Sequence, residues 1–183
     1  MKHPELVERL RAGNRRALAG EELGDVSAAV REYCAVHGQE PNAIVIACSD
    51  SRVIPEHIFS AGIGELFVIR VAGNVLDEHQ LGSIEYAAAH LHCPLILVLG
   101  HTGCGAVAAA LSGHAEGYIR SITDEILRAA GDERDAVKVC RLNVLHGVEL
   151  IRRAFREHPE IPSADLDILG AVYDLRSGAV EFL

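Results

Sequence analysis

Three residues that can do chemistry stand close together after an apolar run at residues 43–47. Cys48, Asp50 and Arg52 follow that run directly. A thiol can bind a metal ion, and a carboxylate can pair with a guanidinium through charge-assisted hydrogen bonds. Asp50 and Arg52 lie two residues apart in an extended segment and point to the same side, so we expect them to pair. A small buried cysteine beside an ordinary loop ion pair is the alternative interpretation.

A second group, His101 and Cys104, follows the apolar run at residues 95–99. Cys104 precedes an Ala-rich segment at 106–111, and the positive end of a helix there favours a thiolate. A lone histidine at such a position is more often part of a structural hydrogen bond than a ligand. Together with Cys48, however, the two residues form a Cys₂His set, which suits zinc and leaves a fourth position open, as in catalytic zinc sites.

The ion pair decides what Asp50 does in such a site. Held by Arg52, the carboxylate stays off the metal and can accept a hydrogen bond from zinc-bound water. Released from Arg52, it can bind the zinc itself and block the open position.

Buried strands alternate with helical patterns along the chain, which predicts parallel strands joined by right-handed connections. Strands are expected at 43–47, 66–70, 95–99 and 166–173, with an antiparallel edge strand at 179–183. Helices are expected at 4–18, 26–36, 55–59, 81–91, 106–111, 118–130 and 135–156. The carboxyl ends of parallel strands meet at one sheet edge, so the two chemical groups should converge.

We therefore expect an α/β fold with a mostly parallel central sheet of about four to five strands flanked by helices. Residues 1–183 are expected to form a single domain, with an N-terminal helical arm over about 1–38. The apolar stripe of the helix at 4–18 is narrow. That helix is expected to lie either on a partner subunit or on its own domain.

Composition excludes several classes of function. The chain has a net charge of −9 and no basic stripe, so nucleic acid and membrane surfaces are not expected partners. The segment at residues 1–5 lacks the apolar core of a signal peptide, which predicts a cytoplasmic protein. Five irregularly spaced cysteines indicate thiols or metal ligands, with Cys34, Cys93 and Cys140 expected as packed thiols.

At this point the residues resemble those of the β-class carbonic anhydrases. The resemblance covers nearly the whole chain. The matching motifs are Gly13-Asn14, Cys48-x-Asp50-Ser51-Arg52, Phe67-Val68-Ile69-Arg70, Ala72-Gly73-Asn74, Ile84-Glu85-Tyr86, His101-x-x-Cys104-Gly105 and Gly170-Ala171-Val172-Tyr173-Asp174.

The resemblance implies reversible hydration of CO2 to bicarbonate and a proton, with one Zn²⁺ per chain and zinc hydroxide as the nucleophile. It assigns Cys48, His101 and Cys104 as zinc ligands, and Asp50 with Arg52 as the dyad that gates the fourth position. It also implies a homodimer or a higher even homo-oligomer.

The resemblance further places Gln39, Phe67 and Tyr86 in the substrate pocket, with Gln39 and part of the apolar wall supplied by a second subunit. CO2 is small, linear and uncharged, so an apolar slot and one donor for the developing oxyanion are needed. Phe67, Val53 and Ala72 can line the slot, and Gln39 can donate.

His90 stands four residues after Tyr86 on one helix face and can begin a path for the proton to solvent. The other interpretation of His90 is an ordinary packed or solvated side chain.

Three other functions remain open at this stage. The run Gly100-x-x-Gly103-x-Gly105 superficially resembles a phosphate-binding loop of a nucleotide-binding protein. The same fold and zinc site can hydrolyse a CO2 analogue such as carbonyl sulfide or carbon disulfide. A non-catalytic zinc module requires a fourth protein ligand, for which Asp50 is the nearby candidate.

Overall fold

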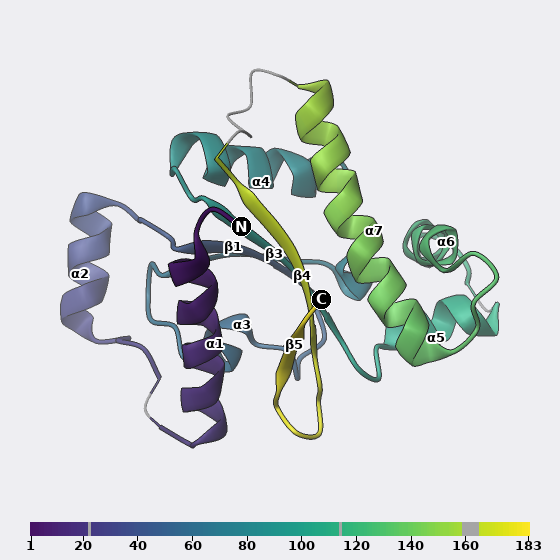
Figure 1. Ribbon diagram of the computed structural model, residues 1–183, viewed down its shortest axis with the longest axis horizontal. Coiled ribbons are helices and arrows are strands. Elements are labelled where there is room, and N and C mark those ends of the chain that lie inside the picture. The colour runs from purple at the N-terminus through teal and green to yellow at the C-terminus, as the bar shows by residue number, and fades with distance from the viewer. Residues whose placement is uncertain (22, 114, 159–164) are drawn as a thin grey trace.

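Five strands form one sheet in the order β2-β1-β3-β4-β5 in the computed structural model of the chain, which describes residues 1–21, 23–113, 115–158 and 165–183 (Figure 1). The pairs β2-β1, β1-β3 and β3-β4 are parallel, and β5 is antiparallel to β4. The strands are β1 (Ala43–Ala47), β2 (Leu66–Arg70), β3 (Leu95–His101), β4 (Asp167–Tyr173) and β5 (Val180–Phe182). The expected mostly parallel α/β sheet is confirmed.

The helices follow the predicted order closely. They are α1 (Pro4–Leu18), α2 (Ala28–His37), α3 (Pro55–Ile58), α4 (Glu78–His90), α5 (Gly105–Ser112), α6 (Ile119–Ala130) and α7 (Ala136–Glu157), with a 3₁₀ turn η1 (Ala72–Asn74). Within the described ranges, no helix combines the length and the apolar character that crossing a membrane requires.

Most boundaries lie within one or two residues of the sequence-based expectation, and two of the differences have a clear cause. Helix α4 begins one turn earlier than residue 81, because Asp77 accepts a hydrogen bond from the backbone of His79 while the Gln80 side chain accepts from the backbone of Asp77. Strand β3 continues past Leu99 to His101, because its pairing with β4 extends that far. The imidazole is therefore fixed by the sheet itself.

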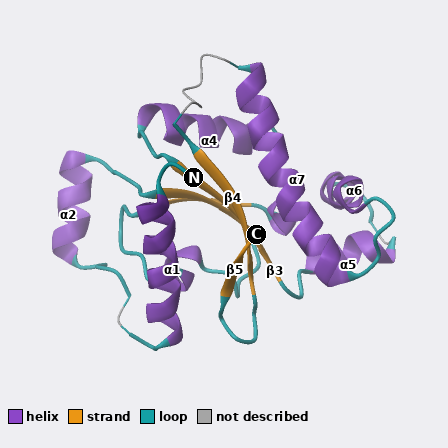
Figure 2. Cartoon of the chain, in the orientation of Figure 1, coloured by secondary structure: helices purple, strands orange, loops and turns teal. Residues whose placement is uncertain are grey.

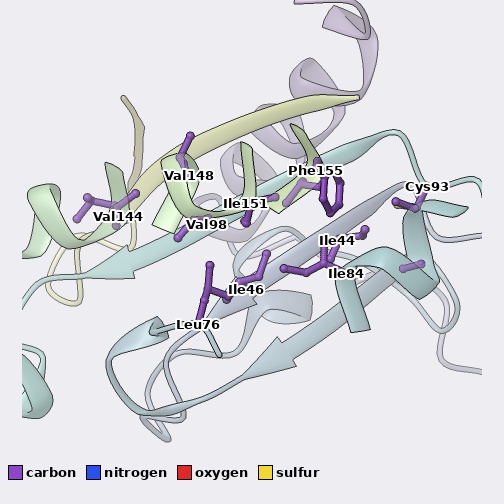
Figure 3. Close-up of a cluster of buried hydrophobic side chains, with 14 of the residues drawn as sticks. Ile44, Ile46, Leu76, Ile84, Cys93, Val98, Val144, Val148, Ile151 and Phe155 are labelled. Carbon is purple, nitrogen blue, oxygen red and sulfur yellow. The ribbon is translucent and has the colours of Figure 1, made fainter. Parts of the chain in front are cut away.

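The central strands are buried on both faces, and alternate residues point to opposite sides. Ile44 and Ile46 of β1 face α4 and α7, where they pack with side chains such as Ile84 and Ile151 (Figure 3). Val45 and its odd-numbered neighbours face α1 and α3 on the other side. Figure 2 shows the sheet as the middle layer between these helices.

The two N-terminal helices differ in how they are attached. Helix α1 lies on its own domain, where Val7 and Leu10 are buried and Asn14 donates to the carbonyls of Ile58 and Gly178. This confirms the second of the two expectations for that helix. Helix α2 has no buried residue and lies at the periphery of the molecule, with Tyr33 and Val36 among the exposed apolar side chains (Figure 1).

Candidate metal centre

Cys48, His101 and Cys104 come together at the carboxyl edge of the sheet. Cys48 follows β1, His101 is the last residue of β3, and Cys104 caps the amino end of α5. Because β1 and β3 are neighbouring parallel strands, their ends meet, and the ligand atoms of the three residues lie within 4.8 Å of one another. All three side chains are buried. The predicted convergence is confirmed, and the donor set suits a metal ion.

The ring of His101 is oriented so that one nitrogen faces the two sulfurs. Its Nδ1 lies 2.9 Å from the carbonyl oxygen of Thr102, which can only accept, so we assign the ring proton to Nδ1. The other nitrogen, Nε2, is buried and has no hydrogen-bond partner within the described part of the chain. A buried nitrogen without a partner is costly unless something binds it, and a metal ion shared with the two thiols meets that need.

The Thr102 carbonyl orients His101, and the Thr102 side chain is in turn held by residues that follow β4. The hydroxyl of Thr102 donates to Asp174 over 3.1 Å and accepts from the backbone of Leu175 over 3.0 Å. Asp174 follows β4 in the sequence, so this contact ties the loop after β3 to the neighbouring strand. Sequence reasoning gave neither Thr102 nor Asp174 a role at this centre, although Asp174 belongs to one of the motifs named above.

The surroundings of Cys48 stabilise a thiolate. The adjacent Cys104 thiol lowers the pKa of Cys48, although burial acts in the opposite direction. Backbone N–H groups add to this effect: Gly73 donates to the sulfur over 3.2 Å and Asp50 over 3.4 Å. The polypeptide therefore presents an anionic sulfur, the form that binds metals.

Opposing influences act on the Cys104 thiol at the start of α5. Its hydrogen bond to the Cys48 thiolate raises its pKa, and burial raises it further. The backbone N–H groups of Val107 and Ala106 in α5 do lower the pKa, as predicted, but their effect is smaller. The helix start thus favours a thiolate at Cys104, as predicted, while Cys48 is the thiol of the pair whose pKa is lowered on balance.

Asp50 and Arg52 form the predicted pair. Nε of Arg52 donates to Oδ1 over 2.9 Å and Nη2 donates to Oδ2 over 2.7 Å, the two-point geometry expected of arginine and carboxylate. The segment is a turn, closed by a hydrogen bond from Val53 to the Asp50 carbonyl, and is not extended as predicted. The Arg52 guanidinium holds the pKa of Asp50 well below its usual range.

Arg70 is a further residue of this edge whose contacts the sequence did not reveal. It ends β2 opposite Ala47, where β1 ends. Its Nε donates to the Cys48 carbonyl over 3.2 Å, and its Nη2 donates to the Asp50 carbonyl over 2.7 Å. Arg70 thus holds the backbone that carries the thiolate and the carboxylate. Its place at the end of a strand beside β1 is the signal that could have identified it.

The residues predicted for the substrate pocket fall into two sets. Val53 follows the Asp50 turn and is fully buried, and Ala72 adjoins Gly73, whose N–H contacts Cys48. These two apolar residues therefore lie near the metal cluster in the sequence and in the fold. Their role in lining the slot stays a prediction.

The second set lies toward the amino ends of the strands, away from the metal cluster. Gln39 is exposed and precedes β1. Phe67 pairs with Ile44, about 13 Å before Cys48 along the strand at about 3.3 Å per residue. The Phe67 ring lies 6.3 Å from that of Tyr86, which in turn lies 5.5 Å from that of His90.

The glycine-rich run that begins at the end of β3 does not form a phosphate-binding loop. Gly100 lies inside β3, where a Cβ would stand 2.5 Å from Val144 and 3.2 Å from the sulfur of Cys140. The turn that follows delivers His101 and Cys104 to the metal cluster. The nucleotide-binding alternative therefore loses the loop on which it rested.

Comparison with known proteins agrees with this geometry. The carbonic anhydrase family profile matches residues 43–180. A carbonic anhydrase of Mycolicibacterium smegmatis is 36% identical over 183 aligned residues, covering 94% of this chain and 89% of its own length.

Solved structures show the same likeness. The β-carbonic anhydrase CafA of Aspergillus fumigatus superposes with a TM-score of 0.74 at 29% identity, over 85% of this chain and 80% of its own. The Coccomyxa β-carbonic anhydrase, solved with acetazolamide, has a TM-score of 0.68 at 27% identity over 99% and 86% of the two chains. The chain therefore belongs to the β-class carbonic anhydrase family, the enzymes that catalyse the hydration of carbon dioxide.

Proposed function

We propose that the metal of this carbonic anhydrase is zinc, one ion per chain, held by Cys48, His101 and Cys104. The observation that carries the proposal is the buried, unpartnered Nε2 of His101 beside two sulfurs. Two sulfurs and one imidazole suit zinc and leave one coordination position for chemistry. When bound, zinc supplies the Lewis acidity that makes water nucleophilic near neutral pH, and the reference value of about 7 comes from a carbonic anhydrase with a different ligand set.

Asp50 then acts as an acceptor that stays ionised. Because Arg52 keeps the pKa of Asp50 low, the carboxylate is charged throughout the neutral range and can accept a hydrogen bond from the attacking water. The same two hydrogen bonds keep Asp50 engaged, which argues against a site closed by a fourth protein ligand. In this proposal Arg52 positions Asp50 and does not touch the substrate.

The substrate pocket is completed by a second copy of the chain. Gln39 and Phe67 lie toward the amino edge of the sheet, away from the cluster of their own chain. They can therefore serve the chemistry only at a partner's metal centre, where the Gln39 amide donates to an oxygen of CO2 and Phe67 with Tyr86 lines the apolar wall. Val53 and Ala72 line the wall from the chain that holds the metal.

A homodimer is accordingly the smallest active unit in this proposal. The exposed apolar side chains of α2, Tyr33 and Val36, support it, because a helix without a buried residue gains stability when a partner covers it. Higher even assemblies are consistent with it: a similar chain, 26% identical with a TM-score of 0.65, belongs to one of two β-carbonic anhydrases of Sordaria macrospora that are described as tetrameric.

Proton release is assigned to His90. Its ring lies 5.5 Å from that of Tyr86, and it is exposed at the end of α4, so it can pass a proton between the pocket and solvent. We also place the protein in the cytoplasm, because its five cysteines are all free thiols, as expected in a reducing compartment.

Stopped-flow CO2 hydration on protein of measured zinc content tests the proposal, scanned from about pH 6.5 to 9 around the expected value near 7. The expected result is about one zinc per chain, with turnover that rises through this range and is abolished by a chelator. Turnover that persists after complete zinc removal contradicts the assignment of the metal. Zinc without CO2 turnover at any pH contradicts its assignment as a catalytic ion and favours a CO2 analogue as substrate.

A further inference from the structure

Helix α7 packs directly on β3 and β4 near the end of the sheet that carries the metal ligands, and glycines leave room for it. A Cβ at Gly100 of β3 would stand 2.5 Å from Val144, and one at Gly170 of β4 would stand 2.7 Å from the same side chain. Farther along the helix, a Cβ at Gly147 would stand 3.2 Å from Val98. A larger side chain at Gly100 or Gly170 would push the helix outward.

This close approach lets two side chains of α7 reach the backbone around the metal centre. The Cys140 thiol donates to the His101 carbonyl over 3.2 Å, and the Asn143 amide donates to the Gly73 carbonyl over 2.8 Å. Cys140 and Asn143 are three residues apart, so they share one face of the helix. Both are buried, with exposed fractions of 5% and 4%.

One of these two carbonyls belongs to a metal ligand, and the other belongs to a residue that donates a hydrogen bond to a ligand. His101 is a ligand, and the N–H of Gly73 donates to the Cys48 sulfur over 3.2 Å. Gly73 has a positive φ of 68°, and a Cβ on it would stand 2.9 Å from Ile126. A larger residue would therefore be strained at this position, and Asn143 is the side chain that anchors the Gly73 carbonyl.

We propose that Asn143 and Cys140 are positioning residues of the metal centre. Asn143 holds Gly73 so that its N–H stays on the Cys48 sulfur, and Cys140 holds the backbone of His101. The N–H···S bond withdraws charge from the sulfur and fixes its direction. The inference rests on the proposed zinc site, and loss of such outer contacts typically weakens metal affinity about 10- to 100-fold.

The test compares zinc release and the cobalt spectrum of four variants with those of the parent. Asn143→Leu removes the donor with little change in shape, Cys140→Ala removes the thiol, and Cys140→Ser keeps a donor. The matched control is Thr123→Val, since Thr123 is equally buried but its hydroxyl donates only to the carbonyls of Ile119 and Arg120 within α6. Zinc release into excess chelator gives a rate, and the Co²⁺-substituted protein gives the thiolate-to-metal charge-transfer band.

Asn143→Leu is expected to release zinc about tenfold faster than the parent and to shift the charge-transfer band, since the sulfur loses a hydrogen bond. Cys140→Ala should show a smaller acceleration, because a thiol is a weak donor, and Cys140→Ser should restore the parent rate. Thr123→Val should match the parent in both readouts. Should Asn143→Leu fail to fold, Asn143→Ser, whose hydroxyl is too short to reach Gly73, is measured in its place.

A folded Asn143 variant with the parent's release rate and the parent's spectrum overturns the proposal. So does an equal acceleration in Thr123→Val, which would indicate general loosening of the core. A parent protein that binds no zinc contradicts the proposed function instead, so the two failures are distinguishable.

Discussion

The metal centre and the predicted substrate pocket differ in how much of each a single chain supplies. Cys48, His101 and Cys104 are buried, meet at one edge of the sheet and are braced by their own chain. Gln39 and Tyr86 are exposed and lie away from that edge, and the exposed fraction of Tyr86 is 49%. In the proposed dimer, metal binding and catalysis are therefore separable: one chain holds the ion, whereas the reaction needs two.

The largest effect is expected from Cys104→Ser, which tests the assignment of the metal ligands. A serine hydroxyl stays protonated and is a poor zinc ligand, so zinc and CO2 hydration should be lost together, down to the uncatalysed rate. Zinc is measured by metal analysis and turnover by stopped flow. Cys93→Ser, which changes a buried thiol remote from the cluster, is the control and should keep both. Full zinc in Cys104→Ser would mean that the ligand assignment is wrong.

Asp50→Asn should separate zinc binding from the rate of CO2 hydration. The amide cannot accept hydrogen bonds as a carboxylate does, so we expect full zinc and a loss of about 100-fold in turnover. Because Arg52 keeps the pKa of Asp50 far below neutrality, neither parent nor variant should show an inflection from residue 50 between about pH 6.5 and 9. Asp77→Asn, at the exposed start of α4, should behave as the parent, and an unchanged turnover in Asp50→Asn would remove Asp50 from the mechanism.

A charge introduced on α2 tests whether the substrate pocket needs a second chain. Val36 is 73% exposed, and Val36→Glu should prevent a partner from covering the helix. We expect the variant to sediment as a monomer, to retain zinc and to lose at least about tenfold in turnover, because the Gln39 donor is lost with the partner. Tyr118→Glu, at a 97% exposed position, is the control. A monomer with the parent's turnover would show that one chain suffices.

The smallest effect is expected from Asp174→Asn, which loosens the loop after β3. Hydrogen bonds from Ser177 hold the pKa of Asp174 below its ordinary value of 3.8, with a further contribution from Thr102. The unfolded chain therefore binds more protons in acid, so this stabilisation is present above about pH 4 and is lost as the pH falls through the folded-state pKa.

Thermal unfolding across pH measures this effect. The melting temperature of Asp174→Asn should lie slightly below that of the parent at about pH 7, and the difference should narrow as the pH falls below about 4. A difference that stays constant with pH would mean that the carboxylate charge is not what stabilises the loop.

Much of the fold was predictable because its strands are short apolar runs with clear boundaries. The run at 43–47 became β1 without change, and the parallel direction of the first four strands followed from the helices between them. The Cys₂His cluster followed in turn from where β1 and β3 end. Residue types and sequence order were sufficient for these features.

Other contacts could not be predicted, because they join residues far apart in the sequence through backbone atoms. Asn143 and Gly73 are separated by 70 positions, and the acceptor is a carbonyl that every residue carries. The turn at Asp50 and the extension of β3 to His101 likewise depend on neighbours in space. Side-chain patterns report which faces are apolar, but they do not report which backbone groups a buried amide will meet.

The metal ligands come from the ends of two separate strands, so the supply of metal affects the stability of the fold. An ion shared by Cys48 and His101 joins the ends of β1 and β3, and it would have to dissociate before those strands could separate. Binding to the folded chain alone stabilises it by about 2.7 kcal/mol when free ion is at about 100 times its dissociation constant. Resistance to heat and proteolysis should therefore rise and fall with the supply of that ion, which we propose to be zinc.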